Sequence, residues 1–346
     1  SRQEPGCRIK SGMTVFNVKD IDVATMGPWT FRKEGIFMGK TILVAVGDCV
    51  YSKHAVRYAA KIGAAQKEAT YTLFHVQALV PKIFSEAAET APEVKAHINA
   101  MVQESAEIAA CTAGTMKDIM LQAGIPENRI EVITQPMQVG MAKDILRKAE
   151  QGGYDAIVLA RRALTPSRDF FIGTTAAKVV DHALGTPVWV ISGETTSMKI
   201  MLAVDGSDNS LQGVDHLIEM VGAHPDLKVT LFHVQPCLTH YYTVDFERKN
   251  PALQKILERQ DKKRMELFFE KAYHRFEAVG LKKKQIETKT KTRSYDISTS
   301  IIEEAKTGNY STVVVGRRGE RDAFFTGRIA MRLVQKITDQ ALWIVP

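Results

Sequence analysis

The chain of 346 residues contains no run of roughly 18 consecutive apolar residues, which argues against a membrane-spanning helix. Its first 38 residues lack the apolar core of a signal peptide. Cysteine is scarce, and the cysteines form neither a CxxC pair nor a pattern that repeats along the chain. We therefore expect free thiols in a reducing, cytoplasmic compartment. The four are Cys7, Cys49, Cys111 and Cys237.

Motifs for catalysis are also missing. The sequence has no Walker-type lysine motif, no HExxH, no GxSxG and no metal-spaced cluster of cysteine and histidine. Nucleotide hydrolysis requires a positioned base, metal ligands and an oriented water molecule. The residues therefore predict no catalytic site and no dedicated metal site.

The sequence does contain a long internal duplication. The segment LFHVQ occurs at residues 73–77 and again at 231–235, an offset of 158 residues. We expect an N-terminal extension (1–38) followed by two compact domains (39–194 and 195–346). The extension is a docking arm, an addition outside the main activity, or vector or upstream sequence before an internal start at Met38. Further matches are 42–46 with 200–204, 154–158 with 310–314, and 186–191 with 340–345, with offsets that fall from 158 to 156 to 154.

Each copy begins with a short, continuously apolar run, at residues 41–46 and 199–204, as expected for a strand that is buried on both faces. Helical and apolar segments then alternate, and Asn250 and Pro251 are suited to begin a long helix in the second copy. The order predicts an α/β fold in which each copy is a five-stranded parallel sheet with helices on both faces. Ligands of such sheets bind beyond the carboxyl ends of the strands, where the strand order reverses.

A glycine-rich loop follows the fourth strand of the second copy. Gly316-Arg317-Arg318-Gly319 is followed by seven residues and then by Gly327-Arg328 at the start of the last helix. Glycines let backbone amides approach a phosphate, a helix start binds anions, and both adjacent arginines are expected to add charge. The first copy has Ala160-Arg161-Arg162-Ala163, nine residues and then Gly173-Thr174.

With these motifs the chain resembles the universal stress protein family in its tandem form, over residues 39–346. The resemblance implies two Rossmann-like, adenine nucleotide alpha hydrolase-like domains. The implied ligand is ATP or another adenine nucleotide, with or without Mg²⁺. It also implies a stress-response regulator that acts through a protein partner. The family's dimer contact falls on the final strands, 187–191 and 341–345, so the two copies are expected to pair within one chain as a pseudo-dimer. A further homodimer is left open.

The resemblance places an aspartate, which contacts the adenosine moiety, at Asp205 in the second copy. The loop there is two residues shorter than the family pattern, and Arg328 replaces a serine or threonine. The second copy is nevertheless the preferred site. Its implied ligand-binding residues are Ala203, Asp205, Val234, Gly316, Arg318, Gly319, Gly327, Arg328 and Ile329.

The first copy keeps the nine-residue spacing and the hydroxyl of Thr174, but alanines replace both early glycines. Gly47 occupies the aspartate position, with Asp48 displaced by one residue. This weaker site would comprise Asp48, Ala160, Arg162, Ala163, Gly173 and Thr174.

Two alternatives stay open beside the nucleotide-binding regulator. One is slow ATP hydrolysis. The other is a scaffold without a small ligand, in which the basic stretch 248–293 docks an anionic partner; few aromatic residues lie there, which disfavours nucleic acid. A solvated helix face also explains the basic stretch. His75 and His233 lie at matching positions in apolar strands, which favours packed, hydrogen-bonded histidines over catalytic ones. Cys49 is expected to be a small filler.

Overall fold

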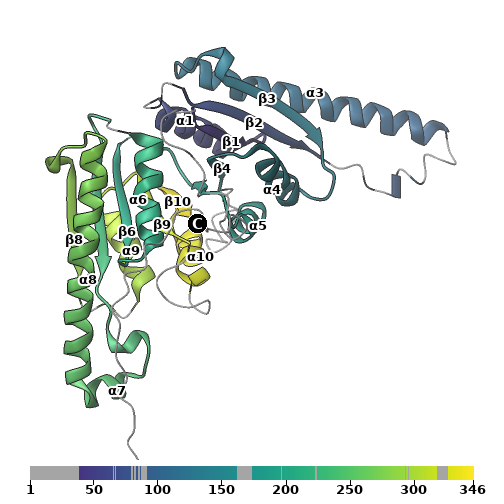
Figure 1. Cartoon of the computed structure of the whole chain (residues 1–346). Coiled ribbons are helices and arrows are strands. Elements are labelled where there is room, and N and C mark those ends of the chain that lie inside the picture. The colour runs from purple at the N-terminus through teal and green to yellow at the C-terminus, as the bar shows by residue number, and fades with distance from the viewer. Residues whose placement is uncertain are drawn as a thin grey trace, which may run out of the picture. The chain divides into compact units, whose positions relative to one another are not determined.

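The computed structural model describes residues 39–346, except 65, 67, 79–80, 82, 85, 87–91, 162–173, 196, 223, 293, 295 and 318–325. The first half of this region contains β1 (Thr41–Ala45), α1 (Val50–Gly63), β2 (Thr70–Gln77), α3 (Pro92–Gln122), β3 (Ile130–Pro136), α4 (Met141–Gly152), β4 (Ala156–Ala160), α5 (Thr174–His182) and β5 (Val188–Ile191). Figure 1 shows these elements in purple to teal.

The second half repeats the order of the main elements, with the short helix α7 directly before its long helix. It contains β6 (Lys199–Val204), α6 (Asp208–Val221), β7 (Lys228–Val234), α7 (Val244–Lys249), α8 (Pro251–Ala278), β8 (Ile286–Lys291), α9 (Ile297–Thr307), β9 (Thr312–Gly316), α10 (Thr326–Lys336) and β10 (Ala341–Val345). Short 3₁₀ turns are η2 (Glu127–Arg129), η3 (Leu238–His240) and η4 (Lys283–Gln285).

The ten strands within the described residues form one sheet in the order β3-β2-β1-β4-β5-β10-β9-β6-β7-β8. Strands within each half are parallel, and the halves join where β5 pairs antiparallel with β10, with Trp189 opposite Trp343. The predicted fold class and the expected contact between the final strands are confirmed. The strand order reverses between β1 and β4 in the first half, and between β6 and β9 in the second.

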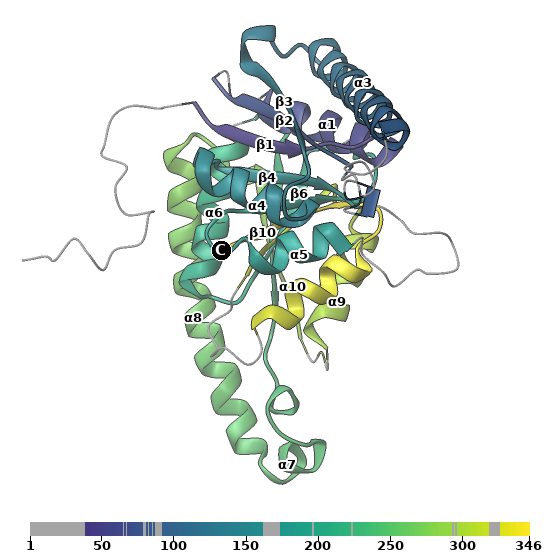
Figure 2. The same ribbon diagram turned by 90° about the vertical axis from the view of Figure 1, so that its right-hand side faces the viewer.

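Two apolar cores lie on opposite faces of this sheet, and each extends through both halves. One packs α1, α3, α6 and α8 against alternate strand residues, and the other packs α4, α5, α9 and α10 against the intervening ones. Figure 2 shows α5 and α10 next to each other, as does Figure 1. The sheet is therefore covered by helices on both faces, and its strand ends are held in fixed positions.

The start of α8 differs in one detail from the sequence prediction. Pro251 is the first residue of the helix, as expected, and Asn250 occupies the N-cap position. The Asn250 side chain does not cap α8, however; its Nδ2 donates to the Phe246 carbonyl, 2.8 Å away. The short helix α7 ends directly before Asn250, and a carbonyl of its last turn accepts from this side-chain amide instead.

Candidate functional site

The ends of three neighbouring strands meet at the point where the strand order of the second half reverses. Ala203 in β6 is paired with Val315 on one side and with Phe232 on the other. The residues that follow along these strands are therefore brought to the same edge of the sheet. Asp205 follows β6, and Val234 and Gly316 end β7 and β9. The structure thus brings together four of the residues that the sequence predicts for this site.

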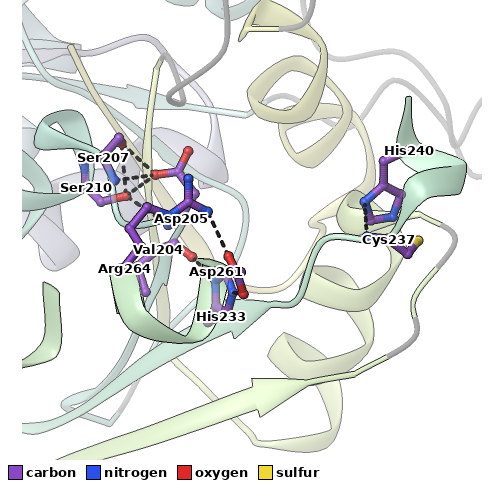
Figure 3. A network of polar contacts seen from close by, with 9 residues as sticks. All are labelled: Val204, Asp205, Ser207, Ser210, His233, Cys237, His240, Asp261 and Arg264. Atoms are coloured by element: carbon purple, nitrogen blue, oxygen red, sulfur yellow. Dashed lines mark hydrogen bonds and ion pairs between the residues drawn. The ribbon is translucent and has the colours of Figure 1, made fainter. Parts of the chain in front are cut away.

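Asp205 is half-buried and is fixed by two serines at the start of α6 (Figure 3). Its Oδ1 accepts from Ser207 Oγ at 2.6 Å and from Ser210 Oγ at 2.8 Å, and its backbone amide donates to Ser210 Oγ at 3.1 Å. Ser207 is also the N-cap of α6, accepting from the Ser210 amide. The carboxylate is held in one orientation at the helix start, where the helix dipole favours negative charge.

A buried polar network lies next to this loop (Figure 3). His233 Nδ1 contacts the Val204 carbonyl at 2.9 Å, and its Nε2 contacts Asp261 Oδ2 at 2.9 Å. Arg264 donates to Asp261 Oδ1 at 2.7 Å. Burial by itself would raise the pKa of the Asp261 carboxyl, but the bonds from His233 and Arg264 outweigh it and hold that pKa below its ordinary value. The interpretation of His233 as a packed, hydrogen-bonded residue is confirmed.

Arg264 also lies against the loop after β6. Gly206 has φ +82°, and a Cβ added there would lie 3.0 Å from Cγ and Nε of Arg264. Only glycine adopts this conformation at little cost while the arginine stem packs so closely. The long helix α8 therefore contributes a cation beside the candidate site. Arg264 is not among the site residues predicted from the sequence.

The sequence does carry a signal for this network. Asp261 lies on the buried face of α8, four residues before Met265 and seven before Phe268. A charged residue at such a spacing needs a partner, because an unpaired buried charge is very costly. His233, in a strand that is otherwise apolar, is the residue that fits.

The matching loop of the first half is simpler. The Gly47 amide donates to Ser52 Oγ at 3.0 Å, as the Asp205 amide does to its own serine, but no carboxylate stands at Gly47. Asp48 is exposed. His75 keeps the bond from Nδ1 to the Val46 carbonyl, at 3.0 Å, and is only partly buried.

The first half also lacks the acidic and basic partners on its long helix. The long helices α3 and α8 are each followed by a glycine of positive φ, Gly124 and Gly280. When the two helices are aligned on these glycines, Ser105 and Ile108 of α3 stand where α8 has Asp261 and Arg264. Ile108 is exposed to 52%. The two candidate sites therefore differ in the helix that covers them as well as in their loops.

One sequence-based expectation about the glycine-rich loops is corrected. Arg317, the first of the two adjacent arginines in the second copy, was expected to supply charge to a phosphate, but Arg317 and its first-half counterpart Arg161 are buried and donate to backbone carbonyls. Arg317 bonds the carbonyls of Val180 and Ala183 at the end of α5, and Arg161 bonds the end of α10. A guanidinium that is buried and bonded to backbone carbonyls is unsuited to reach a solvent-facing ligand.

Other predicted residues lie partly or wholly outside the described region. Ala160 ends β4, and Ile329 is half-buried in α10, packed against the core. Gly327 and Arg328 lie in the first turn of α10, and Thr174 begins α5. The remaining predicted residues fall outside the described residues: Arg162, Ala163, Gly173, Arg318 and Gly319.

Among the described residues, no group of three or more histidine, cysteine, aspartate or glutamate side chains could hold a metal ion. None of the described helices is both long and apolar enough to cross a membrane. The three cysteines within the described part of the chain, Cys49, Cys111 and Cys237, are free thiols, as expected.

The halves are doubly wound, Rossmann-like α/β domains, and each has a candidate site where its strand order reverses. A model of the universal stress protein family matches residues 38–192 and again 196–344. The chain therefore belongs to the universal stress protein family, in its tandem form.

Two solved structures that resemble most of this chain agree with this assignment of the fold. A universal stress protein from Archaeoglobus fulgidus DSM 4304 is 13% identical, with 89% of this chain and 99% of that chain covered and a TM-score of 0.57. A candidate universal stress protein from Pseudomonas aeruginosa UCBPP-PA14 is 14% identical, with 88% and 92% covered and a TM-score of 0.51. A shorter Archaeoglobus fulgidus family member, solved in complex with dAMP, is 18% identical, with 44% and 98% covered and a TM-score of 0.31. No curated protein matches this chain significantly.

Proposed function

We propose that the second half binds an adenine nucleotide, ATP or a close relative, at the strand ends around Asp205. The bound state is then read by a protein partner, so that the chain acts as a stress-response regulator in the cytoplasm rather than as an enzyme. Mg²⁺ can accompany the phosphates. The same chain can also form a homodimer through surfaces other than β5 and β10.

The orientation of Asp205 is the observation that carries this proposal. Two serine hydroxyls and the start of α6 hold its carboxylate at the carboxyl edge of the sheet, the place where sheets of this order bind ligands. A carboxylate whose position is fixed before binding loses little entropy when it accepts hydrogen bonds from a nucleoside. The neighbouring ends of β7 and β9 offer backbone groups at the same edge.

The difference between the halves supports the choice of the second site. The first half has Gly47 where the second has Asp205, and it lacks the acidic and basic pair of the long helix. Its loop also replaces both early glycines by alanine, whose methyl group hinders the approach of a phosphate to the backbone.

Thermal unfolding with and without ATP, ADP and AMP tests the proposal, together with mass spectrometry of any nucleotide released from the purified protein by heat. Binding at 100-fold excess over Kd stabilises a protein by about 2.7 kcal/mol, a shift that is easily seen. Asp205→Ala and Gly319→Val should reduce the shift, whereas the first-half changes Asp48→Ala, beside the position that matches Asp205, and Ala163→Val, at the position that matches Gly319, should not. If the first-half changes reduce the shift as much as the second-half changes do, the choice of the second half is wrong. If no nucleotide shifts the melting temperature of the wild type, nucleotide binding is refuted.

Release of inorganic phosphate from ATP distinguishes a regulator from a slow hydrolase. We expect no release above a buffer control. Release that disappears in Asp205→Ala would favour the hydrolase instead. Docking of an anionic partner by residues 248–293 is the remaining alternative, and it predicts that charge reversal at the exposed Lys262 weakens partner capture without altering the nucleotide-dependent shift.

A further inference from the structure

The last helix of each half is held at its C-terminal end by residues of the other half. At the end of α10, the Arg161 guanidinium donates to the carbonyls of Gln335, at 2.7 Å, and Ile337. Ser192 Oγ of the first half donates to the Ile337 carbonyl as well, at 3.2 Å. These carbonyls belong to the last turn of the helix and the residue after it, where no intrahelical donor is available.

The reciprocal contact is present at the end of α5. The Arg317 guanidinium donates to the carbonyls of Ala183, at 2.7 Å, and Val180. Arg161 and Arg317 occupy matching positions, one residue after β4 and β9. Their backbone amides are bound to the Ile191 and Val345 carbonyls of the adjacent final strands, at 2.8 and 2.6 Å.

Both arginines are almost fully buried, with exposed fractions of 6% and 8%. A buried cation that bonds two carbonyls at a helix C-terminus satisfies orphan acceptors and opposes the negative end of the helix dipole. Breaking such a contact leaves buried polar groups without partners, which is costly. Each contact therefore fixes the axial position of a helix in the opposite half.

The other end of α10 is the part that matters for the ligand. Its first turn contains Gly327 and Arg328, and its free amides and positive dipole end suit a phosphate. A helix of 11 residues is a rod of roughly 16 Å, so a shift at its C-terminus is carried to its N-terminus. Arg317, in turn, directly follows Gly316, which ends β9 at the same sheet edge as Asp205.

From these contacts we propose that Arg161 is a positioning residue for the nucleotide site of the opposite half, and that Arg317 connects that site to α5. This inference rests on the proposed nucleotide binding in the second half. It makes the second site dependent on the first half of the chain. Occupancy of the second site is then sensed at the end of α5.

The test measures ATP affinity by isothermal titration on the full chain, counting only the binding that Asp205→Ala abolishes. Arg161→Met should weaken this binding by about 2- to 30-fold, the range found when a coupling residue outside a site is removed. Arg161→Lys, which keeps the charge but not the paired donors, should lie between Arg161→Met and the wild type. The control is Arg57→Met, which removes an exposed arginine from α1 of the same half and should leave the affinity unchanged.

Hydrogen exchange provides a second readout, which needs no change at Arg161. Saturating ATP should slow amide exchange in the segment around Val180 and Ala183 of the wild type. Arg317→Met should abolish that effect while exchange near Asp205 is still slowed. A role in folding alone would lower the melting temperature without moving either readout.

The outcomes are separable. Affinity of Arg161→Met within about twofold of Arg57→Met overturns the inference and leaves nucleotide binding standing. The inference is also overturned if ATP leaves amide exchange at the end of α5 of the wild type unchanged. This second result decides for or against the inference even if Arg161→Met does not fold. Absence of any Asp205-dependent binding in the wild type overturns both the inference and the proposed function.

Discussion

Acidification from pH 7 to pH 5 should destabilise the joined halves through one buried imidazole, His216. It lies on α6 and accepts a hydrogen bond from Trp189 Nε1 at 3.0 Å. Trp189 stacks on Trp343 across the β5–β10 junction, with ring centroids 4.2 Å apart. Burial lowers the pKa of His216 to about 3, and the charge of Lys40 acts in the same direction.

The sign of the effect follows from proton uptake by each state. In the unfolded chain the pKa of His216 returns to about 6.5, so between about pH 6.5 and pH 3 the unfolded state binds a proton that the folded state does not. Stability is therefore fully present above about pH 6.5 and falls as the pH decreases. At 1.36 kcal/mol for each pKa unit, this residue alone removes about 2 kcal/mol at pH 5 and about 3 kcal/mol at pH 4, relative to pH 7.

The assay is urea unfolding at pH 7 and pH 5, followed by tryptophan fluorescence, for the wild type and for His216→Gln. Glutamine can accept the same bond from Trp189 but does not titrate. Other groups contribute to the pH dependence of both proteins, so the difference between the two isolates His216. We expect His216→Gln to lose about 2 kcal/mol less than the wild type between these pH values. Equal losses would show that the imidazole is not held neutral at the junction, and would refute the reasoning.

Two further changes test the network beside the candidate site. Gly206→Ala should cost about 1–2 kcal/mol of unfolding free energy, because alanine resists a positive φ and its methyl group would press on the Arg264 stem; a neutral result in chemical denaturation would contradict this. Asp261→Ala should cost about 3–5 kcal/mol, since it leaves His233 buried without its carboxylate partner. Ser105→Ala, the matched change in the first half, should alter the unfolding midpoint little, and a comparable loss there would assign the cost of Asp261→Ala to general helix packing.

Most of the fold could be predicted because the central strands are buried on both faces. The apolar run at 199–204 coincides with β6, and the run at 41–46 exceeds β1 by one residue. The start of the long helix at Pro251 was also signalled locally, by proline at its first position. These signals depend only on neighbours in sequence, so they can be read without a structure.

The predictions that were wrong or missing concern contacts between segments that are distant in the sequence. The direction of a side chain that follows a strand end depends on what lies beside that strand, and the role of Arg317 follows only from its contact with the end of α5. The capping role expected for Asn250 was wrong for a similar reason, because its side-chain amide donates to a carbonyl of the short helix α7 instead. Asp261 and His233 are 28 residues apart, and nothing local links them.

The duplication itself favours the role assigned to the buried arginines. If Arg161 served only to bind a phosphate, we would expect it to be replaced along with the loop glycines, whose first-half counterparts are Ala160 and Ala163. The first half nevertheless retains the arginine at the position that matches Arg317, and both side chains make the same contact with the opposite half. A residue that holds the partner helix α10 is needed whether or not its own loop binds a ligand. The first half can therefore lose its nucleotide site and still be required for the second.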